Sequence, residues 1–257
     1  MQIKFLLVLF SVCISINLFA GTKDTTVTGD LNRDNIMDVV KVSFATNEDG
    51  IYSYLEGSFS VDINGSVVSA KSDQADVFDV KIVEIGPGYT NSAVMVSCYG
   101  FGDQGEYFFY TLKSKEIVSL GSIKAWGTAE VKGDGKILVN DWMGFWSLQA
   151  EYLYNKETNK LEMNRKDSYE VNAEGTVKNS FKLLKSREDN SEVVQTLKAG
   201  TKITVLKCDT KPVCKTADGY DDDYDCDWYL MRTAGGAEGW VRMKDFRENI
   251  NDLPWAG

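Results

Sequence analysis

Short runs of alternating apolar and polar residues limit the folds open to this chain more than any other feature. The runs are separated by glycine and asparagine, as in Ile63-Asn-Gly-Ser66 and Gly133-Asp-Gly135, which suit tight turns. No long stretch has a helical period. Alternation with a period of two is typical of half-buried strands, so the sequence predicts an all-β protein. Strands are predicted at residues 38–44, 59–63, 77–83, 93–98, 107–112, 129–132, 136–139 and 147–154.

The predicted strands fall into two parts. Residues 21–175 are expected to form a β-meander, arranged as a reduced propeller or as a sandwich. Polar and charged residues fill 155–180, which places the domain boundary near Gly175. Residues 176–250 hold a closely spaced series of short strands that suits a small closed barrel, and 251–257 form a short tail.

The first twenty residues have the layout of a secretory signal peptide. Lys4 precedes an apolar run at 5–16, and Ala20 precedes a polar stretch. A membrane-spanning helix needs roughly 20 apolar residues, so this run is too short, and no other segment is apolar enough. We therefore predict cleavage near Ala20 after residues 1–20, a secreted or periplasmic location, and no membrane span in the mature chain.

The acidic composition narrows the partners that this chain can have. Its formal charge is −10, and loss of residues 1–20 would remove one lysine and no acid, giving −11. Such a chain is not expected to bind nucleic acid, and it suits cations or a basic protein. The chain has no histidine, which excludes Ser-His-Asp and Cys-His catalysis. No carboxylate pair stands out, so we predict a protein that is not an enzyme.

Oxygen-bearing side chains recur at a regular spacing in residues 29–38. Loop positions 1, 3, 5 and 9 carry oxygen, and position 7 offers a backbone carbonyl. Ca²⁺ takes about six to eight oxygens from carboxylates, amides and carbonyls, and its shell is looser than that of Mg²⁺. An acidic, solvated turn is the alternative. The sequence favours a structural Ca²⁺ site with the ligands Asp30, Asn32, Asp34, Ile36 (through its carbonyl) and Asp38.

This loop resembles the Asp-x-Asn-x-Asp-Gly-x-x-Asp calcium loop of FG-GAP and integrin-type β-propeller repeats. A similar loop occurs in small secreted bacterial β proteins, including calcium-binding ones that are similar to lysozyme inhibitors. Two departures are visible, because Asn35 stands where glycine is usual and Lys41 stands where a full EF-hand has glutamate. The resemblance implies a single calcium loop and not a helix-loop-helix unit.

Four segments of the C-terminal part share a pattern with one known family, and they are Val193-Val-Gln-Thr-Leu-Lys-Ala-Gly200, Lys202-Ile-Thr-Val-Leu206, Trp228-Tyr-Leu-Met-Arg232 and Gly239-Trp-Val-Arg-Met-Lys-Asp-Phe246. On these residues the C-terminal part resembles a bacterial SH3 (SH3b) domain. The resemblance implies a small barrel that binds a peptidoglycan peptide or an envelope protein. It also implies a ligand groove formed by Trp228, Tyr229 and Trp240, although the two tryptophans suit a core position equally well.

An insert at 208–226 separates two of the predicted barrel strands. Cys208 and Cys226 end and begin these strands, so a disulfide between them would close the base of the insert. Cys214 is an alternative partner for either. The acidic run 221–225 is read as a solvated stretch, with a second Ca²⁺ site as the less favoured interpretation.

Aromatic residues gather at 142–146 and 107–110, and Trp126 stands between these two stretches in the sequence. They suit either a recognition platform for sugar or peptide or ordinary packing in a β domain, and packing is favoured. Taken together, the sequence predicts an exported, non-enzymatic binding protein of the bacterial envelope with a structural Ca²⁺ site. The alternative is an inhibitor of a basic wall-degrading enzyme such as lysozyme, which the acidic charge suits.

Overall fold

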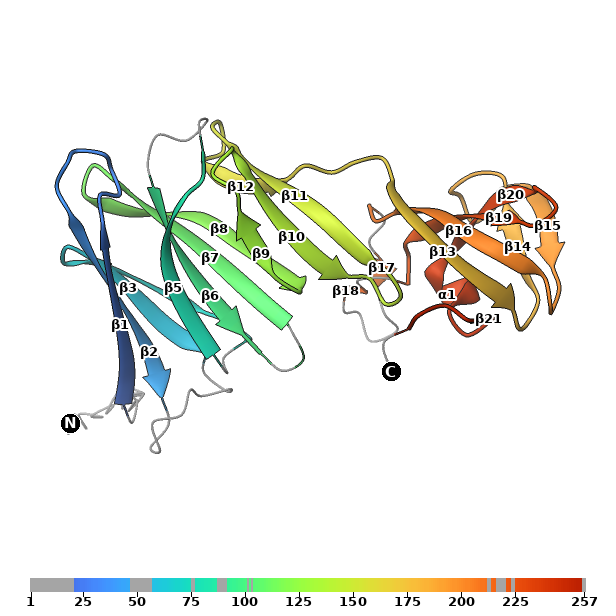
Figure 1. Cartoon of the computed structure of the whole chain (residues 1–257), viewed down its shortest axis with the longest axis horizontal. Helices are drawn as coiled ribbons and strands as arrows, with labels where there is room; N and C mark the ends of the chain where they lie inside the picture. Colours follow the sequence, from blue (N-terminus) through green and yellow to red (C-terminus); the bar gives the residue numbers. More distant parts are fainter. Residues whose placement is uncertain are drawn as a thin grey trace, which may run out of the picture.

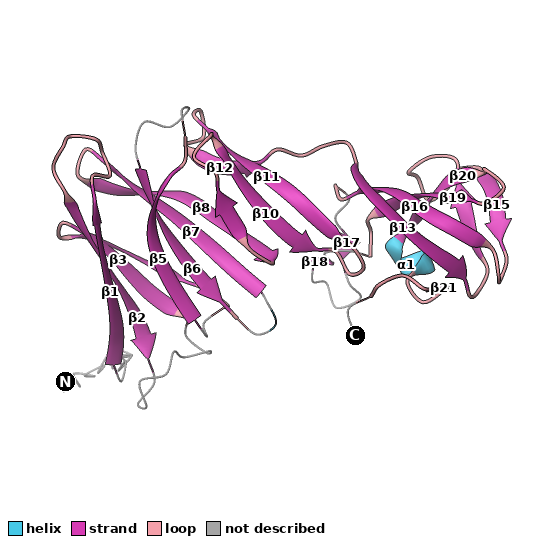
Figure 2. Ribbon diagram, in the orientation of Figure 1, coloured by secondary structure: helices cyan, strands magenta, loops and turns pink. Residues whose placement is uncertain are grey.

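The prediction of an all-β protein is confirmed by the structure, a computed structural model (Figures 1 and 2). Within the described residues the only helix is the single turn α1 (Met243–Phe246). No helix among them is long and apolar enough to cross a membrane. The predicted signal peptide lies outside the described residues, which are 21–46, 57–74, 77–86, 92–100, 102, 104–211, 214–215, 221–222 and 225–255.

Three four-stranded antiparallel sheets follow one another along the chain, and each is a meander, as predicted. The first sheet contains β1 (Gly21–Gly29), β2 (Asp38–Thr46), β3 (Ser58–Ile63) and β4 (Ser66–Lys71). The second contains β5 (Val77–Glu84), β6 (Ser92–Tyr99), β7 (Gln104–Lys113) and β8 (Glu116–Trp126). The third contains β9 (Ala129–Val131), β10 (Lys136–Trp142), β11 (Ser147–Asn155) and β12 (Lys160–Met163).

The second sheet is the middle layer of a stack, and its two faces pack on different neighbours (Figure 1). Phe108 on β7 joins a core with residues of the first sheet, such as Phe44. Tyr107 and Phe109 point to the opposite face and join a core with Ile137 of the third sheet. Side chains alternate along a strand, so a sheet buried on both faces needs apolar residues at nearly every position. This explains why β6 and β7 read as continuous apolar runs, whereas β2 alternates.

The C-terminal sheet has seven strands in the order β15-β14-β20-β19-β16-β13-β21. Inward-facing residues from β14, β15, β16, β19 and β20 share one core with α1, as in a small barrel. The strands are β13 (Tyr169–Val177), β14 (Phe181–Leu184), β15 (Val193–Leu197), β16 (Lys202–Asp209), β19 (Trp228–Thr233), β20 (Glu238–Arg242) and β21 (Ile250–Asn251), with β17 (Cys214–Lys215) and β18 (Asp221–Asp222) paired in the insert.

Strand β13 moves the boundary between the two parts of the molecule. The polar composition of residues 155–180 placed this boundary near Gly175, but β13 pairs with β16 and β21 of the C-terminal sheet. The sheet therefore begins at Tyr169. Its polar residues misled the sequence analysis because one face of an antiparallel strand is free to be polar.

The connection between β10 and β11 joins the two parts. Phe145 in this connection is fully buried, and its ring centroid lies 5.5 Å from that of Tyr229 on β19 and 4.9 Å from that of Trp255 in the tail. The neighbouring Trp146 donates a hydrogen bond from Nε1 to the Tyr229 hydroxyl, 3.2 Å away. One continuous core therefore runs from the middle sheet through this connection into the C-terminal sheet.

Candidate functional site

The loop at 29–38 is organised by its own oxygen-bearing side chains. The Asp30 carboxylate accepts hydrogen bonds from the backbone N–H of Asp34, at 3.1 Å, and of Asn35, at 2.8 Å. The side-chain amide oxygen of Asn32 accepts a hydrogen bond from the backbone N–H of Asp34. A carboxylate oxygen of Asp34 accepts one from the backbone N–H of Ile36 at 2.8 Å. Three of the five predicted ligands thus turn oxygens toward the same short stretch of backbone.

Asp38 ties this loop to the rest of the first sheet. Its side chain is 3% exposed. One carboxylate oxygen accepts from the Leu31 N–H at 2.8 Å, and the other accepts from the Asn64 side-chain amide at 2.6 Å. Asn64 also accepts from the Val39 N–H at 2.9 Å. The carboxylate therefore links the first residue of β2 to the β3–β4 turn.

The loop turns sharply at two residues with positive φ, Arg33 at 61° and Asn35 at 64°. Asparagine tolerates this conformation better than most residues, which explains how Asn35 replaces glycine here. The Ile36 side chain is an exposed hydrocarbon without donor atoms, so the backbone carbonyl is the only ligand that Ile36 could offer to a cation. No group of three or more acidic, cysteine or histidine side chains is arranged to hold a metal within the part of the chain that the structure describes. The calcium site stays a prediction.

The three aromatic residues predicted for the barrel groove do not form one surface. Tyr229 has no exposed surface, because Phe145 and Phe246 pack against its ring. Trp228 precedes it on β19 and points to the opposite face of the sheet, where it is 2% exposed beneath the Arg242 guanidinium. Trp240 is half-buried on that same face. The predicted groove is wrong because neighbouring residues of a strand face opposite sides.

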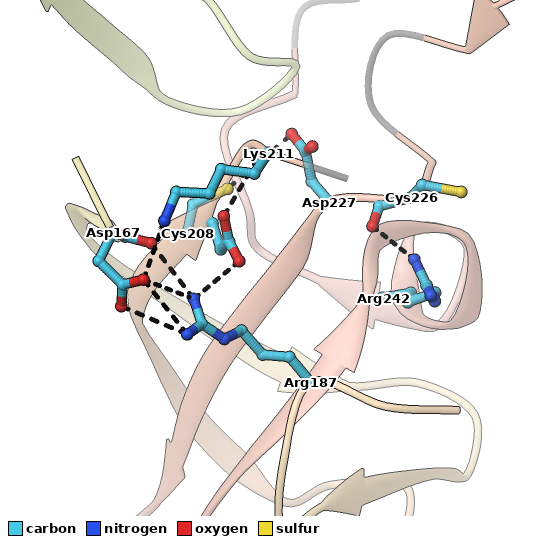
Figure 3. Close-up of polar contacts among 8 residues, drawn as sticks. Asp167, Arg187, Cys208, Lys211, Cys226, Asp227 and Arg242 are labelled. Atoms are coloured by element: carbon cyan, nitrogen blue, oxygen red, sulfur yellow. Dashed lines mark hydrogen bonds and ion pairs between the residues drawn. The ribbon is translucent and has the colours of Figure 1, made fainter. Parts of the chain in front are cut away.

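Charged side chains form a paired network where the insert leaves the barrel (Figure 3). Arg187 lies 2.7 Å from the buried carboxylate of Asp209 and also contacts Asp167. Lys211 contacts Asp167 at 2.9 Å. Hydrogen bonds from Lys211 and Arg187 hold the pKa of Asp167 below its usual value. The network joins the β12–β13 segment, the β14–β15 connection and the end of β16.

The predicted disulfide between Cys208 and Cys226 is wrong. Cys208 is a free, buried thiol whose Sγ lies 3.9 Å from a carboxylate oxygen of Asp227. Burial raises the pKa of this thiol well above its usual value. Figure 3 shows the Cys226 sulfur pointing away from Cys208. The side chain of the alternative partner, Cys214, lies outside the described residues, as does most of the acidic run 221–225.

A cavity of about 660 Å³ opens on the outer surface of the C-terminal sheet, and sequence analysis did not find it. Strand register explains its lining, because Glu174 is paired with Thr204, which is paired with Arg232 across β13, β16 and β19. Lys202 lies on the same face. Residues opposite one another in an antiparallel sheet point to the same side. The charged residues of the lining are Glu174, Lys202, Arg232 and Asp252.

No protein-family model matches this chain, and no curated protein matches its sequence. Its function is therefore argued from its own residues.

Proposed function

We propose that this protein is an exported, non-catalytic binding protein of the bacterial envelope. In this proposal the C-terminal SH3b-like barrel recognises a peptide of the cell wall or an envelope protein. The observation that carries the proposal is the cavity on the outer face of β13, β16 and β19. It brings two cations, Lys202 and Arg232, and two acids, Glu174 and Asp252, to one open site. The lack of any histidine supports a role other than acid–base catalysis.

The two cationic side chains of this cavity make exposed hydrogen bonds and ion pairs that a ligand could replace. Lys202 donates to the Thr176 hydroxyl at 2.7 Å and lies 4.0 Å from an Asp252 oxygen. Arg232 is paired with Glu238 at 2.6 Å, and both side chains are exposed. Exposed ion pairs contribute only about 0–1 kcal/mol, so a ligand displaces them at little cost. A peptide that carries both carboxylate and ammonium groups matches the two signs of charge.

Binding to peptidoglycan tests this proposal. We expect the full-length secreted protein to bind purified peptidoglycan and a soluble wall peptide with free amino and carboxyl groups, measured by sedimentation and by titration calorimetry. The double variant Lys202→Ala/Arg232→Ala should bind at least about tenfold more weakly, a loss of about 1.4 kcal/mol. Lys185→Ala/Arg247→Ala removes the same charge from other exposed positions and should bind normally. Failure of the intact protein to bind either material would overturn the proposal.

We further propose that residues 29–38 hold a structural Ca²⁺. The support is the collection of Asp30, Asn32 and Asp34 oxygens around one short turn. Asp38 fixes the end of this turn through Leu31. A bound ion would stabilise the folded chain, because the unfolded loop does not gather these oxygens.

A disulfide within the insert is also proposed, between Cys226 and Cys214. Its support is that Cys98 and Cys208 are the free thiols of the described residues, which leaves Cys214 as the partner in the mature chain. Peptide mapping without reduction should recover these two cysteines in one linked fragment. Alkylation of Cys214 or Cys226 without reduction would contradict the pairing.

The net negative charge of the chain supports one alternative function, which is inhibition of a basic wall-degrading enzyme such as lysozyme. Inhibition at a protein concentration near that of the enzyme would support it. Unchanged lysis in the presence of a large excess of this protein would remove it.

A further inference from the structure

Trp126 stands exposed at the end of β8, between two cavities at the junction of the second and third sheets. Trp126 is 42% exposed, and it is the only aromatic residue among the exposed large apolar residues of the part of the chain that the structure describes. A cavity of about 640 Å³ lies against it, and a second of about 440 Å³ is also lined by Trp126. Both volumes fall in the range of about 300–1,000 Å³ that small-molecule sites occupy.

The backbone beneath Trp126 is held rigidly by the third sheet. The backbone N–H of Trp126 donates a hydrogen bond to a carboxylate oxygen of Asp141, 2.7 Å away. The next residue, Gly127, has φ of +148°, and a Cβ there would lie 2.2 Å from the carbonyl oxygen of Asn140. The Gly127 carbonyl also accepts from the Tyr107 hydroxyl at 2.6 Å. The exposed indole therefore projects from a fixed base, which lowers the entropic cost of placing a ligand on it.

The larger cavity combines aromatic faces with short polar side chains. Tyr99 adds a second aromatic wall, and its ring is supported by Tyr107 in a T-shaped contact at 6.0 Å. Among its described lining residues are three aromatics and a single acid, with no lysine or arginine. The aromatic residues are Tyr99, Trp126 and Trp142, and the polar ones are Thr128, Asn140, Asp141 and Ser147.

This combination matches one class of ligand better than others. A pyranose ring has an apolar face of C–H groups and a rim of hydroxyls, so one face stacks on an indole while the rim forms hydrogen bonds. Hydroxyl, amide and carboxylate side chains serve as donors and acceptors for such a rim. We infer that the cleft beside Trp126 binds a pyranose unit of an uncharged glycan, with Trp126 as the stacking platform. This site is separate from the barrel cavity and does not depend on the peptide proposed there.

Soluble sugar oligomers test the inference without any peptide present. We expect the full-length secreted protein to show a saturable change in tryptophan fluorescence with a tetramer of N-acetylglucosamine or with cellotetraose. Titration calorimetry should give the same dissociation constant. Trp126→Ala should weaken binding at least about tenfold, equivalent to about 1.4 kcal/mol. Trp126→Phe should keep part of the affinity, because it retains an aromatic face.

Two further variants keep the test specific. Asn140→Ala should weaken binding without changing the melting temperature, since Asn140 is exposed on the rim of the cleft. Leu153→Ala removes another exposed apolar side chain from the third sheet, outside both cavities, and should bind normally. Absence of a saturable signal with both oligomers would overturn the inference, as would equal losses in the Trp126 and Leu153 variants. Because Lys202→Ala/Arg232→Ala should leave sugar binding intact, failure of the barrel proposal is distinguishable from failure here.

Discussion

The loop at 29–38 and the junction around Phe145 are both fixed by side chains, but over very different distances along the chain. The hydrogen bonds that loop residues make with one another span two to seven residues, the longest being from Leu31 to Asp38. Two side-chain contacts reach further, from Asp38 to Asn64 and from Arg33 to Glu84. At the junction, Trp146 reaches Tyr229, 83 residues away. Contacts between near neighbours leave a pattern in the sequence. The junction joins two distant segments, and neither segment carries a sequence pattern that indicates the other as its partner.

The junction also buries a residue that the sequence predicts to bind a ligand. Tyr229 was expected to face a binding groove, but the β10–β11 connection covers it with Phe145. The chain thus uses one face of its own barrel to hold the two parts together. The charged side chains of β13, β16 and β19 lie on the opposite face of the sheet and line the cavity there.

The largest expected effect comes from cutting the junction. Phe145→Ala should lower the free energy of unfolding by about 3–5 kcal/mol, because it leaves a cavity among Tyr229, Phe246 and Trp255. Denaturant unfolding followed by tryptophan fluorescence measures the change. Leu153→Ala, exposed on the third sheet, is the control and should stay within about 0.5 kcal/mol of the wild type. A loss below about 1 kcal/mol for Phe145→Ala would mean that the two parts do not depend on this contact.

Binding of Ca²⁺ should have the next largest effect on stability, and this effect should depend on the ligands of the loop at 29–38. At a Ca²⁺ concentration about 100 times the dissociation constant, the ion should add about 2.7 kcal/mol to the free energy of unfolding. The melting temperature should therefore rise with Ca²⁺ and fall with EDTA, and Asp34→Ala should remove the difference. Equal melting temperatures in Ca²⁺ and EDTA would rule out the site.

Asp38 should matter with or without the ion. Asp38→Ala leaves the Leu31 N–H and the Asn64 amide without their buried acceptor, which costs about 1–3 kcal/mol. We expect this loss in EDTA as well, whereas Asp34→Ala should be nearly silent there because Asp34 is exposed. Thermal unfolding of both variants in EDTA makes the comparison. If the two variants behave alike, Asp38 has no structural role apart from the metal.

The smallest effect isolates one hydrogen bond of the junction. Trp146→Phe keeps an aromatic ring but removes the Nε1 donor to the Tyr229 hydroxyl, and should cost about 0.5–1.5 kcal/mol. A double-mutant cycle with Tyr229→Phe measures the coupling energy between the two side chains. Each substitution should cost less when the other partner has already been replaced. Additive losses in the cycle would show that the bond contributes nothing.

Much of the fold follows from short-range features of the sequence. Alternation in β2 and the continuous apolar runs of β6 and β7 mark the strands. The turn at Asn64 and Gly65 has φ of 53° and 90°, as its Asn-Gly sequence requires. The loop at 29–38 was found because its oxygens stand at a fixed spacing. Each of these features depends on residues only a few positions apart.

Long-range packing decided what the sequence did not show. The sequence placed Tyr229 and Trp228 in one groove and Cys208 in a disulfide, but the side chains face different surroundings in the folded sheet. Trp126 and Phe145 are both large aromatic residues next to a glycine in the sequence, yet Trp126 is exposed and Phe145 is fully buried. Local periodicity determines which residues form strands. Only the packing of one sheet on another determines which aromatic side chains become core and which stay open to a ligand.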